Sequence, residues 1–153
     1  MTGYDLVAVA RQRIGDFWSL TQSQVYRELA AMAEGGLVAA GERGPRDRRP
    51  YALTDAGRTA FQEWVNREPG EESVRFPLLV SMVFGGHVEP ERMAAYLERH
   101  RAMHAKRLAT YEAQRNEIDP AFVEADPFAV APLDFGIAYE RAVLEWFEKL
   151  RLR

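Results

Sequence analysis

The sequence has no cysteine among its 153 residues. This absence excludes disulfides, zinc sites with thiolate ligands and cysteine nucleophiles. No apolar run approaches the roughly 20 residues that a membrane-spanning helix requires. The first residues also lack the basic start and the apolar block that mark a signal peptide. We therefore expect an intracellular, cytoplasmic protein.

Catalytic patterns are absent as well. The sequence contains no glycine-rich phosphate loop, no nucleophile elbow and no convincing pair of acid and base residues. His100 and His104 stand four residues apart, a spacing that can hold a metal ion on one face of a helix. No acidic residue completes a recognised metal motif with them, so we interpret both as structural or interface residues. We expect no enzyme activity, no metal site and no cofactor.

An excess of positive charge is also lacking, because the formal net charge is −3. The total conceals an asymmetry between the two parts of the chain. Residues 1–67 carry nine Lys/Arg and eight Asp/Glu, whereas residues 68–153 carry eleven and fifteen. Within residues 42–49, four arginines stand against two acids. A local basic segment of this kind suits contact with phosphates better than the net charge suggests.

An ordered series of helix and strand signals is present in the first part of the chain. Apolar spacing and the capping residues Thr21 and Thr54 predict three helices, over residues 4–14, 22–34 and 55–66. Two short strands, residues 37–40 and 49–53, flank a tip that contains two glycines and a proline. The third helix is expected to turn its apolar residues inward: Ala56, Ala60, Phe61, Trp64 and Val65.

A polar break at residues 68–72 predicts a domain boundary, with one domain over residues 1–67 and another over residues 74–153. The second part predicts helices over residues 75–84, 90–116 and 134–152, and a loop over residues 119–132. The first of these helices is apolar almost all round and should be buried on most sides. Three helices bury little surface alone, so we expect a second copy of the chain to cover the surplus in a twofold dimer.

The order helix, strand, basic tip, strand and helix is typical of a winged helix-turn-helix that binds DNA. The fold class we expect is mainly α with a small β-wing, followed by a C-terminal helical dimerisation domain. Base edges would be contacted from the first turns of the second helix, by Ser23, Gln24 and Arg27. Phosphates or the minor groove would be contacted by the remaining candidates: Thr21, Tyr26, Arg46, Arg48 and Arg49. The alternative is that these are ordinary solvent-facing residues.

The same residues resemble the PadR family of bacterial transcriptional regulators. The likeness is carried by FWSLTQSQVYRELAAMAEGGLV at residues 17–38, by YALTDAGR at residues 51–58, and by Gly3-Tyr4-Asp5-Leu6. It implies a DNA-binding regulator whose C-terminal helices form a homodimer. It also implies one more apolar helix before Gly3, which is missing from this sequence. We expect either a native start upstream of Met1 or a truncated chain.

The resemblance further permits a small aromatic effector, because family members respond to phenolic acids or flat drugs. The aromatic and sulfur-bearing candidates for such a site are Met82, Phe84, Tyr139, Trp146 and Phe147. The alternative is that these side chains form the core of the dimer, since aromatic residues at helical spacing usually pack in cores.

We therefore interpret the chain as a transcriptional repressor. Its dimer would bind a near-palindromic DNA operator and be released by the effector. The alternative function is a helical protein–protein interaction module that has lost DNA binding. A small metal-dependent or phenolic-binding enzyme is the third class.

Overall fold

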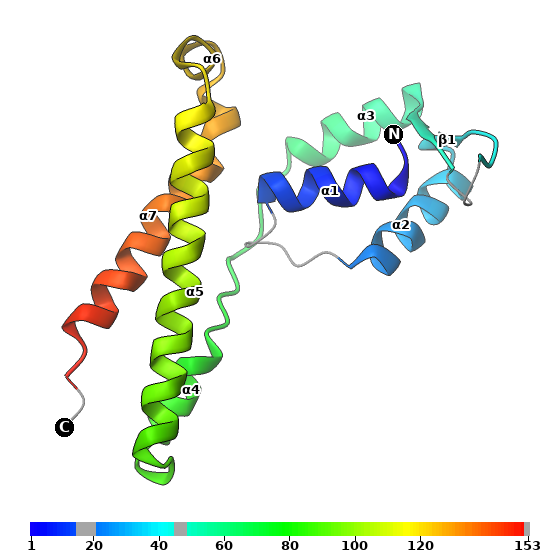
Figure 1. Cartoon of the computed structure of the whole chain (residues 1–153). Helices are drawn as coiled ribbons and strands as arrows, with labels where there is room; N and C mark the ends of the chain where they lie inside the picture. Colours follow the sequence, from blue (N-terminus) through cyan, green and yellow to red (C-terminus); the bar gives the residue numbers. More distant parts are fainter. Residues whose placement is uncertain (15–20, 45–48, 152–153) are drawn as a thin grey trace. The chain divides into compact units, whose positions relative to one another are not determined.

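The computed structural model describes residues 1–14, 21–44 and 49–151, with the side chains of all of these except residues 11–14. Two compact units are present, Met1–Glu72 and Ser73–Arg153. The elements of the first unit follow the predicted order (Figure 1). They are α1 (Gly3–Ile14), α2 (Gln22–Glu34), β1 (Val38–Ala40), β2 (Tyr51–Leu53) and α3 (Asp55–Val65).

The wing is a two-stranded antiparallel sheet. Val38 lies opposite Leu53, and Ala40 lies opposite Tyr51. The first two residues of the chain extend this pairing beyond β2, because Thr2 forms a bridge with Pro50 and the Tyr51 amide donates to the Met1 carbonyl at 2.8 Å. The strands are shorter than the two predicted runs, which were 37–40 and 49–53.

Threonine side chains begin all three helices of the first unit. The Thr21 hydroxyl accepts the amide of Gln24, and the Gln24 side chain in turn accepts the amide of Thr21. Thr2 and Asp5 form the same reciprocal pair ahead of α1. Thr54 accepts the amide of Gly57 ahead of α3. Each hydroxyl satisfies a backbone N–H that the first turn of a helix leaves without a partner, as predicted for Thr21 and Thr54.

The outer side of α3 differs from the prediction. Phe61, Trp64 and Val65 were expected to point inward, but all three are more than half exposed. Of the smaller residues, Ala56 is exposed and Ala60 is half-buried. The reason is that α3 is held at its first turn, where Gly57 is buried against Leu37 and Leu53. The described part of this unit buries the apolar side chains of Val7, Leu29 and Val38.

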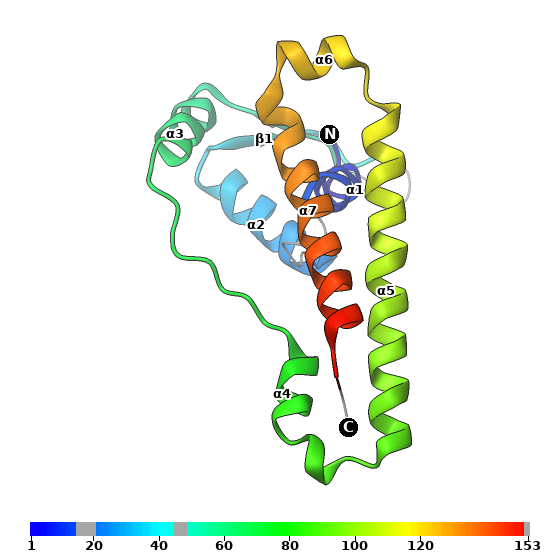
Figure 2. The same cartoon turned by 90° about the vertical axis from the view of Figure 1, so that its left-hand side faces the viewer.

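The second unit is built around two long helices, α5 (Pro90–Glu117) and α7 (Pro127–Lys149), which lie side by side in Figures 1 and 2. The shorter elements are α4 (Pro77–Val83), a 3₁₀ turn (Gly85–His87) and α6 (Pro120–Ala125). The buried side chains of this unit are Leu78, Met93, Val130, Ile137 and the polar pair His104 and Glu140.

The predicted loop over residues 119–132 is wrong, because α6 and the first turns of α7 occupy it. Each of these helices starts with an aspartate cap followed by proline, Asp119-Pro120 and Asp126-Pro127. Proline is well suited to the first helical position, where its missing N–H would have no intrahelical partner. The prolines therefore start helices here, and only Pro132 lies inside one.

The prediction for residues 75–84 is also wrong in extent and in burial. The helix α4 has seven residues, and only Leu78 on it is buried. Pro77 sets its start, and Gly85-Gly86 follows its end. A single helix can turn only one stripe toward α5, so its other apolar residues remain exposed: Leu79, Val80, Val83 and Phe84.

Candidate nucleic-acid interface

The first turn of α2 is fixed by its cap. The Gln24 Oε1 atom accepts the Thr21 amide at 2.9 Å and the Thr21 hydroxyl at 2.8 Å. A bidentate contact with adenine needs both Oε1 and Nε2 of a glutamine. The carbonyl oxygen of Gln24 already serves the helix in this arrangement, and the base contact predicted for Gln24 stays a prediction. Thr21 is likewise engaged in the cap.

The exposed face of α2 presents Ser23 and Arg27. Among the described residues, Arg27 pairs with the neighbouring Glu28, at 3.4 Å between Nη2 and Oε1, and both side chains are largely exposed. An exposed ion pair of this kind contributes little stability, so the guanidinium can exchange it for another anion or a base edge.

Tyr26 lies between the exposed face and the interior. A Cβ atom on Gly3 would lie 2.7 Å from the Tyr26 Cε1 atom, so the ring of Tyr26 packs directly over the backbone at the start of α1. Glycine at this position permits the close approach of α1 and α2. Tyr26 thus has a packing role beside the predicted contact with phosphate.

The base of the wing is closed by two hydrogen bonds. The Gly41 amide donates to the Pro50 carbonyl at 2.8 Å, and Arg49 Nε donates to the Gly41 carbonyl at 3.0 Å. One hydrogen-bond donor of Arg49, the Nε atom, is therefore used within the wing. The other two predicted wing contacts, Arg46 and Arg48, lie outside the described residues.

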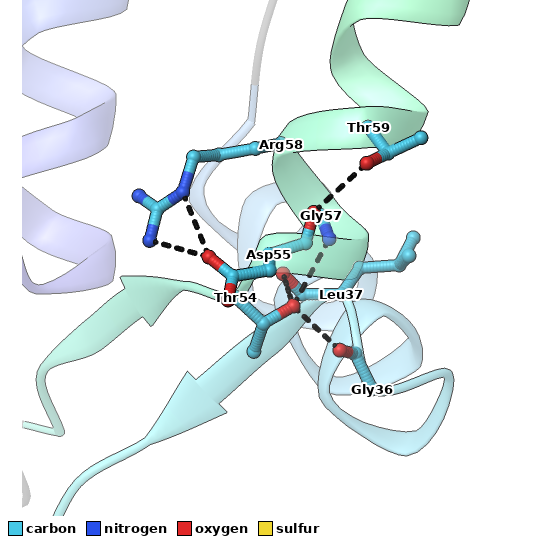
Figure 3. A network of polar contacts seen from close by, with 7 residues as sticks. All are labelled: Gly36, Leu37, Thr54, Asp55, Gly57, Arg58 and Thr59. Carbon is cyan, nitrogen blue, oxygen red and sulfur yellow. Dashed lines mark hydrogen bonds and ion pairs between the residues drawn. The ribbon is translucent and has the colours of Figure 1, made fainter.

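A polar network joins the wing to α3 (Figure 3). The Thr54 hydroxyl lies 2.7 Å from the Gly36 carbonyl and 3.0 Å from the Leu37 carbonyl, and its amide also donates to Leu37. Gly36 has a φ of 71°, a left-handed conformation that glycine adopts without strain. The turn after α2, the end of β2 and the start of α3 are therefore joined at one point.

A second group of predicted residues lies in the helical unit. Tyr139, Trp146 and Phe147 are brought together on α7, with 4.8 Å between the ring centres of the last two. Met82 and Phe84 are on or next to α4 instead; Phe84 is mostly exposed and makes none of the described ring contacts. Among the described ring contacts, those of the predicted set therefore involve the three residues of α7.

Two neighbours of this group, Phe76 and Glu140, were not singled out in the sequence analysis, and His104 was interpreted there as a structural or interface residue. Phe76 and His104 stack with their ring centres 5.7 Å apart, and His104 Nδ1 lies 2.5 Å from Glu140 Oε2. Glu140 follows Tyr139 directly in the sequence, but thirty-six residues separate it from His104. Only the packing of α5 on α7 brings the two together, so no local pattern could reveal the pair.

The structural or interface role predicted for His100 and His104 stays a prediction. Among the described residues, no group of three His, Cys, Asp or Glu side chains could hold a metal ion. Partial burial lowers the pKa of His100, and the charges of His104 and Arg99 lower it further. In the part of the chain that the structure describes, no helix is long and apolar enough to cross a membrane.

Comparison with protein families matches both units. Residues 1–63 match the family described as "Transcriptional regulator PadR-like family", and residues 74–152 match "Virulence activator alpha C-term". The chain belongs to the PadR-like family of transcriptional regulators. The two matched ranges lie on either side of the polar segment between the units.

Two relatives of this PadR-like chain match nearly its full length. It is 22% identical to the "Negative transcriptional regulator PadR" of Bacillus subtilis over 162 residues, which cover 98% of this chain and 87% of that protein. It is 26% identical to the "Probable transcriptional regulator Rv1176c" of Mycobacterium tuberculosis over 165 residues, which cover 97% and 87%.

Solved structures show the same PadR-like fold, a winged helix followed by a C-terminal helical region. Bacillus subtilis PadR in complex with operator DNA aligns with a TM-score of 0.76 and 22% identity, over 97% of this chain and 87% of that one. The Vibrio cholerae virulence activator AphA aligns with a TM-score of 0.72 and 26% identity, over 97% and 86%. Another structure of Bacillus subtilis PadR contains p-coumaric acid.

Proposed function

We propose that this chain is a DNA-binding transcriptional repressor that acts as a homodimer in the cytoplasm. The observation that carries the proposal is the start of α2. Its reciprocal cap fixes the first turn and leaves Ser23 and Arg27 exposed, shortly before a two-stranded wing. A helix presented in this way fits the major groove of DNA. The operator complex of a PadR relative supports the same function.

The contacts divide by their chemistry. Ser23 and Arg27 would contact base edges, and a guanidinium suits the O6 and N7 atoms of guanine. Gln24 and Thr21 would orient the helix through the cap and offer their remaining polar atoms to phosphates. Tyr26, Arg46, Arg48 and Arg49 complete the phosphate contacts, which position the protein without specifying sequence.

Two copies would place two such helices on a near-palindromic operator. Half-sites that are read by a dimer lie about one helical turn of DNA apart, roughly 34 Å. The exposed apolar residues of α4 offer a surface for the second copy. A small aromatic effector would release the dimer by binding better to a state in which the two helices are not spaced for the operator. The p-coumaric acid complex of a relative supports this class of ligand.

The test is fluorescence anisotropy with labelled DNA from upstream of the chain's own gene, at several salt concentrations. The wild-type chain should bind with a strong salt dependence, because phosphate contacts release counterions. Arg27→Ala should weaken specific binding by about 1–3 kcal/mol. Arg48→Ala should weaken binding to every sequence and reduce the salt slope by about 1.

Arg101→Ala is the matched control, since it removes an exposed arginine from α5 in the helical unit. It should leave both the affinity and the salt slope unchanged. Absence of salt-sensitive binding, both by this chain and by a form extended upstream, would contradict the repressor and favour the protein–protein interaction module. An Arg48 variant with the wild-type slope would remove the wing from the interface.

A further inference from the structure

One threonine hydroxyl lies where α2, the wing and α3 meet (Figure 3). The Thr54 Oγ1 atom lies 2.7 Å from the Gly36 carbonyl oxygen and 3.0 Å from the Leu37 carbonyl oxygen. The same atom accepts the Gly57 amide at 3.0 Å. A hydroxyl has one hydrogen to donate and two lone pairs that accept. Its hydrogen is therefore shared between two carbonyls of the turn after α2, while a lone pair caps α3.

This turn is fastened to α2 on one side and to the wing on the other. The Leu37 amide donates to the Met32 carbonyl in the last turn of α2 at 2.8 Å, and the Leu37 carbonyl accepts the Thr54 amide at 3.1 Å. Leu37 directly precedes β1, and Thr54 directly follows β2. Among the described hydrogen bonds, those that connect α2 with the wing pass through this turn and Thr54.

The wing has little packing of its own to fix its direction. Each strand has three residues, and Val38 is buried whereas the other five are exposed or half-buried. A two-stranded hairpin of this size is marginally stable by itself. Met1 and Thr2 pair with the chain at Pro50 and Tyr51, which connects the wing with the start of α1. Its connection with α2 is the one made by Thr54.

We propose that Thr54 is a positioning residue for DNA binding, whose hydroxyl sets the angle between α2 and the wing. The proposal rests on the proposed function for the DNA contacts themselves, and it adds the group that couples them. When two binding elements are held in a fixed geometry, the second binds at a high effective concentration once the first is bound. Without the shared hydrogen, the wing would lose its fixed direction and contact phosphates less often.

The first experiment measures the salt dependence of binding by the full chain to labelled DNA from upstream of its own gene. Thr54→Val keeps nearly the same shape and removes the hydroxyl. It should reduce the salt slope by about 1, although it removes no positive charge. Adding Arg48→Ala to Thr54→Val should leave the slope unchanged, because the wing contact is already lost. Thr54→Ser restores the hydroxyl and should bind with the wild-type slope.

Thr2→Val is the matched control for the loss of a helix cap. The Thr2 hydroxyl also begins a helix of the first unit, but its described bonds are to Asp5 in the first turn of α1. This variant should lose stability and keep the wild-type salt slope. The slope therefore separates a positioning role from a role in stability alone.

The second experiment measures the direction of the wing without DNA. The chain has no cysteine, so nitroxide labels can be attached through Ala30→Cys in α2 and Ala52→Cys in β2, two exposed positions. Electron paramagnetic resonance gives the distribution of distances between the labels, and dilution with unlabelled chain restricts it to distances within one copy. Thr54→Val should broaden this distribution, and Thr54→Ser should not.

Thr54→Asp separates the cap from the connection with α2. Aspartate is among the best N-cap residues, so this variant should keep α3 intact and fold. Its carboxylate can accept the Gly57 amide but has no hydrogen for the two carbonyls. We therefore expect a broad distance distribution in Thr54→Asp as well, and this result does not require Thr54→Val to fold.

The proposal is overturned if Thr54→Asp has the narrow distance distribution of the wild type, since Thr54 would then only cap α3. It is also overturned if Thr54→Val keeps the wild-type salt slope, or if Arg48→Ala reduces the slope equally in Thr54→Val and in the wild type. A chain that shows the broad distributions but binds no DNA would refute the repressor alone. A chain that binds DNA with the same slope in every Thr54 variant would refute the role of Thr54 alone.

Discussion

Single hydroxyl groups do much of the positioning in the DNA-binding unit. Thr2, Thr21 and Thr54 each stand immediately before a helix and accept an amide of its first turn. At α2 the cap is reciprocal, so the polar face of the helix starts at a fixed residue. Under the proposed function, we therefore expect affinity for DNA and stability of the unit to be linked at Thr21.

Thr21→Ala should destabilise the first unit by about 1 kcal/mol, the usual effect of losing an N-cap hydroxyl. Hydrogen exchange of the α2 amides measures this, because it reports on that unit separately. Thr59→Ala is the control, since the Thr59 hydroxyl bonds to a carbonyl within α3 and does not cap a helix. Equal effects of the two variants would show that the Thr21 cap has no special role.

At this scale the sequence predicted the caps but not all their partners. Thr21 and Thr54 follow from residue type and position alone. Gln24 stands three residues after Thr21, as the capping-box pattern requires, so its internal role could have been predicted as easily as a DNA contact. The pair of His104 and Glu140 could not, because it depends on the packing of two distant helices.

Among the elements, the start of α3 is the most constrained. A Cβ atom on Gly57 would overlap the Leu37 carbonyl oxygen and lie 2.9 Å from a Leu53 methyl carbon. The overlapping atom belongs to the backbone and cannot rotate away. The junction between the wing and α3 therefore requires glycine at this position.

Gly57→Ala should destabilise the first unit by about 2–3 kcal/mol, in the range of overpacked interior sites. Urea unfolding and DNA binding should both report the loss. Gly70→Ala is the matched control, because no atom lies within 4 Å of a Cβ at Gly70. That change should stay within about 0.5 kcal/mol, and a Gly57 variant as stable as the control would disprove the constraint.

The position of α2 was predictable because a capping residue precedes its apolar stripe, whereas α5 has no side-chain cap and was predicted from its apolar spacing alone. The loop predicted over α6 and the start of α7 was wrong because of its prolines. Proline disrupts the interior of a helix, but it is favoured at the first helical position. The sequence alone does not tell the two situations apart. The aspartate before Pro120 and Pro127 was the available signal.

For the whole molecule, the exposed apolar residues of α4 are the surface that the proposed second copy would cover. Val83 is 78% exposed at the end of α4, and Leu79, Val80 and Phe84 beside it are also exposed. Burial was expected here from composition, and a single chain does not provide it. The sequence shows which residues are apolar and which face of a helix they share. It does not show whether the same chain or another one covers that face.

Val83→Glu should raise the dimer dissociation constant by at least about tenfold, because a carboxylate would have to be buried at the interface. Light scattering over a dilution series measures the change. Val74→Glu introduces the same charge at a valine that is 76% exposed in the irregular segment, and it should leave the dimer intact. A Val83 variant that remains dimeric would remove α4 from the interface.

The closure of the wing at its base has a consequence for how such a protein can diversify. Gly41 is tied to Pro50 and Arg49 by backbone and side-chain bonds that do not involve the residues between them. These bonds hold the two ends of the tip together. The entropic cost of closing a loop rises only slowly with its length, so a longer or shorter tip would change the stability of the wing little. Tips of different sequence or length can therefore replace one another between these anchors. Such replacements would change the affinity for DNA without changing α2 or its cap.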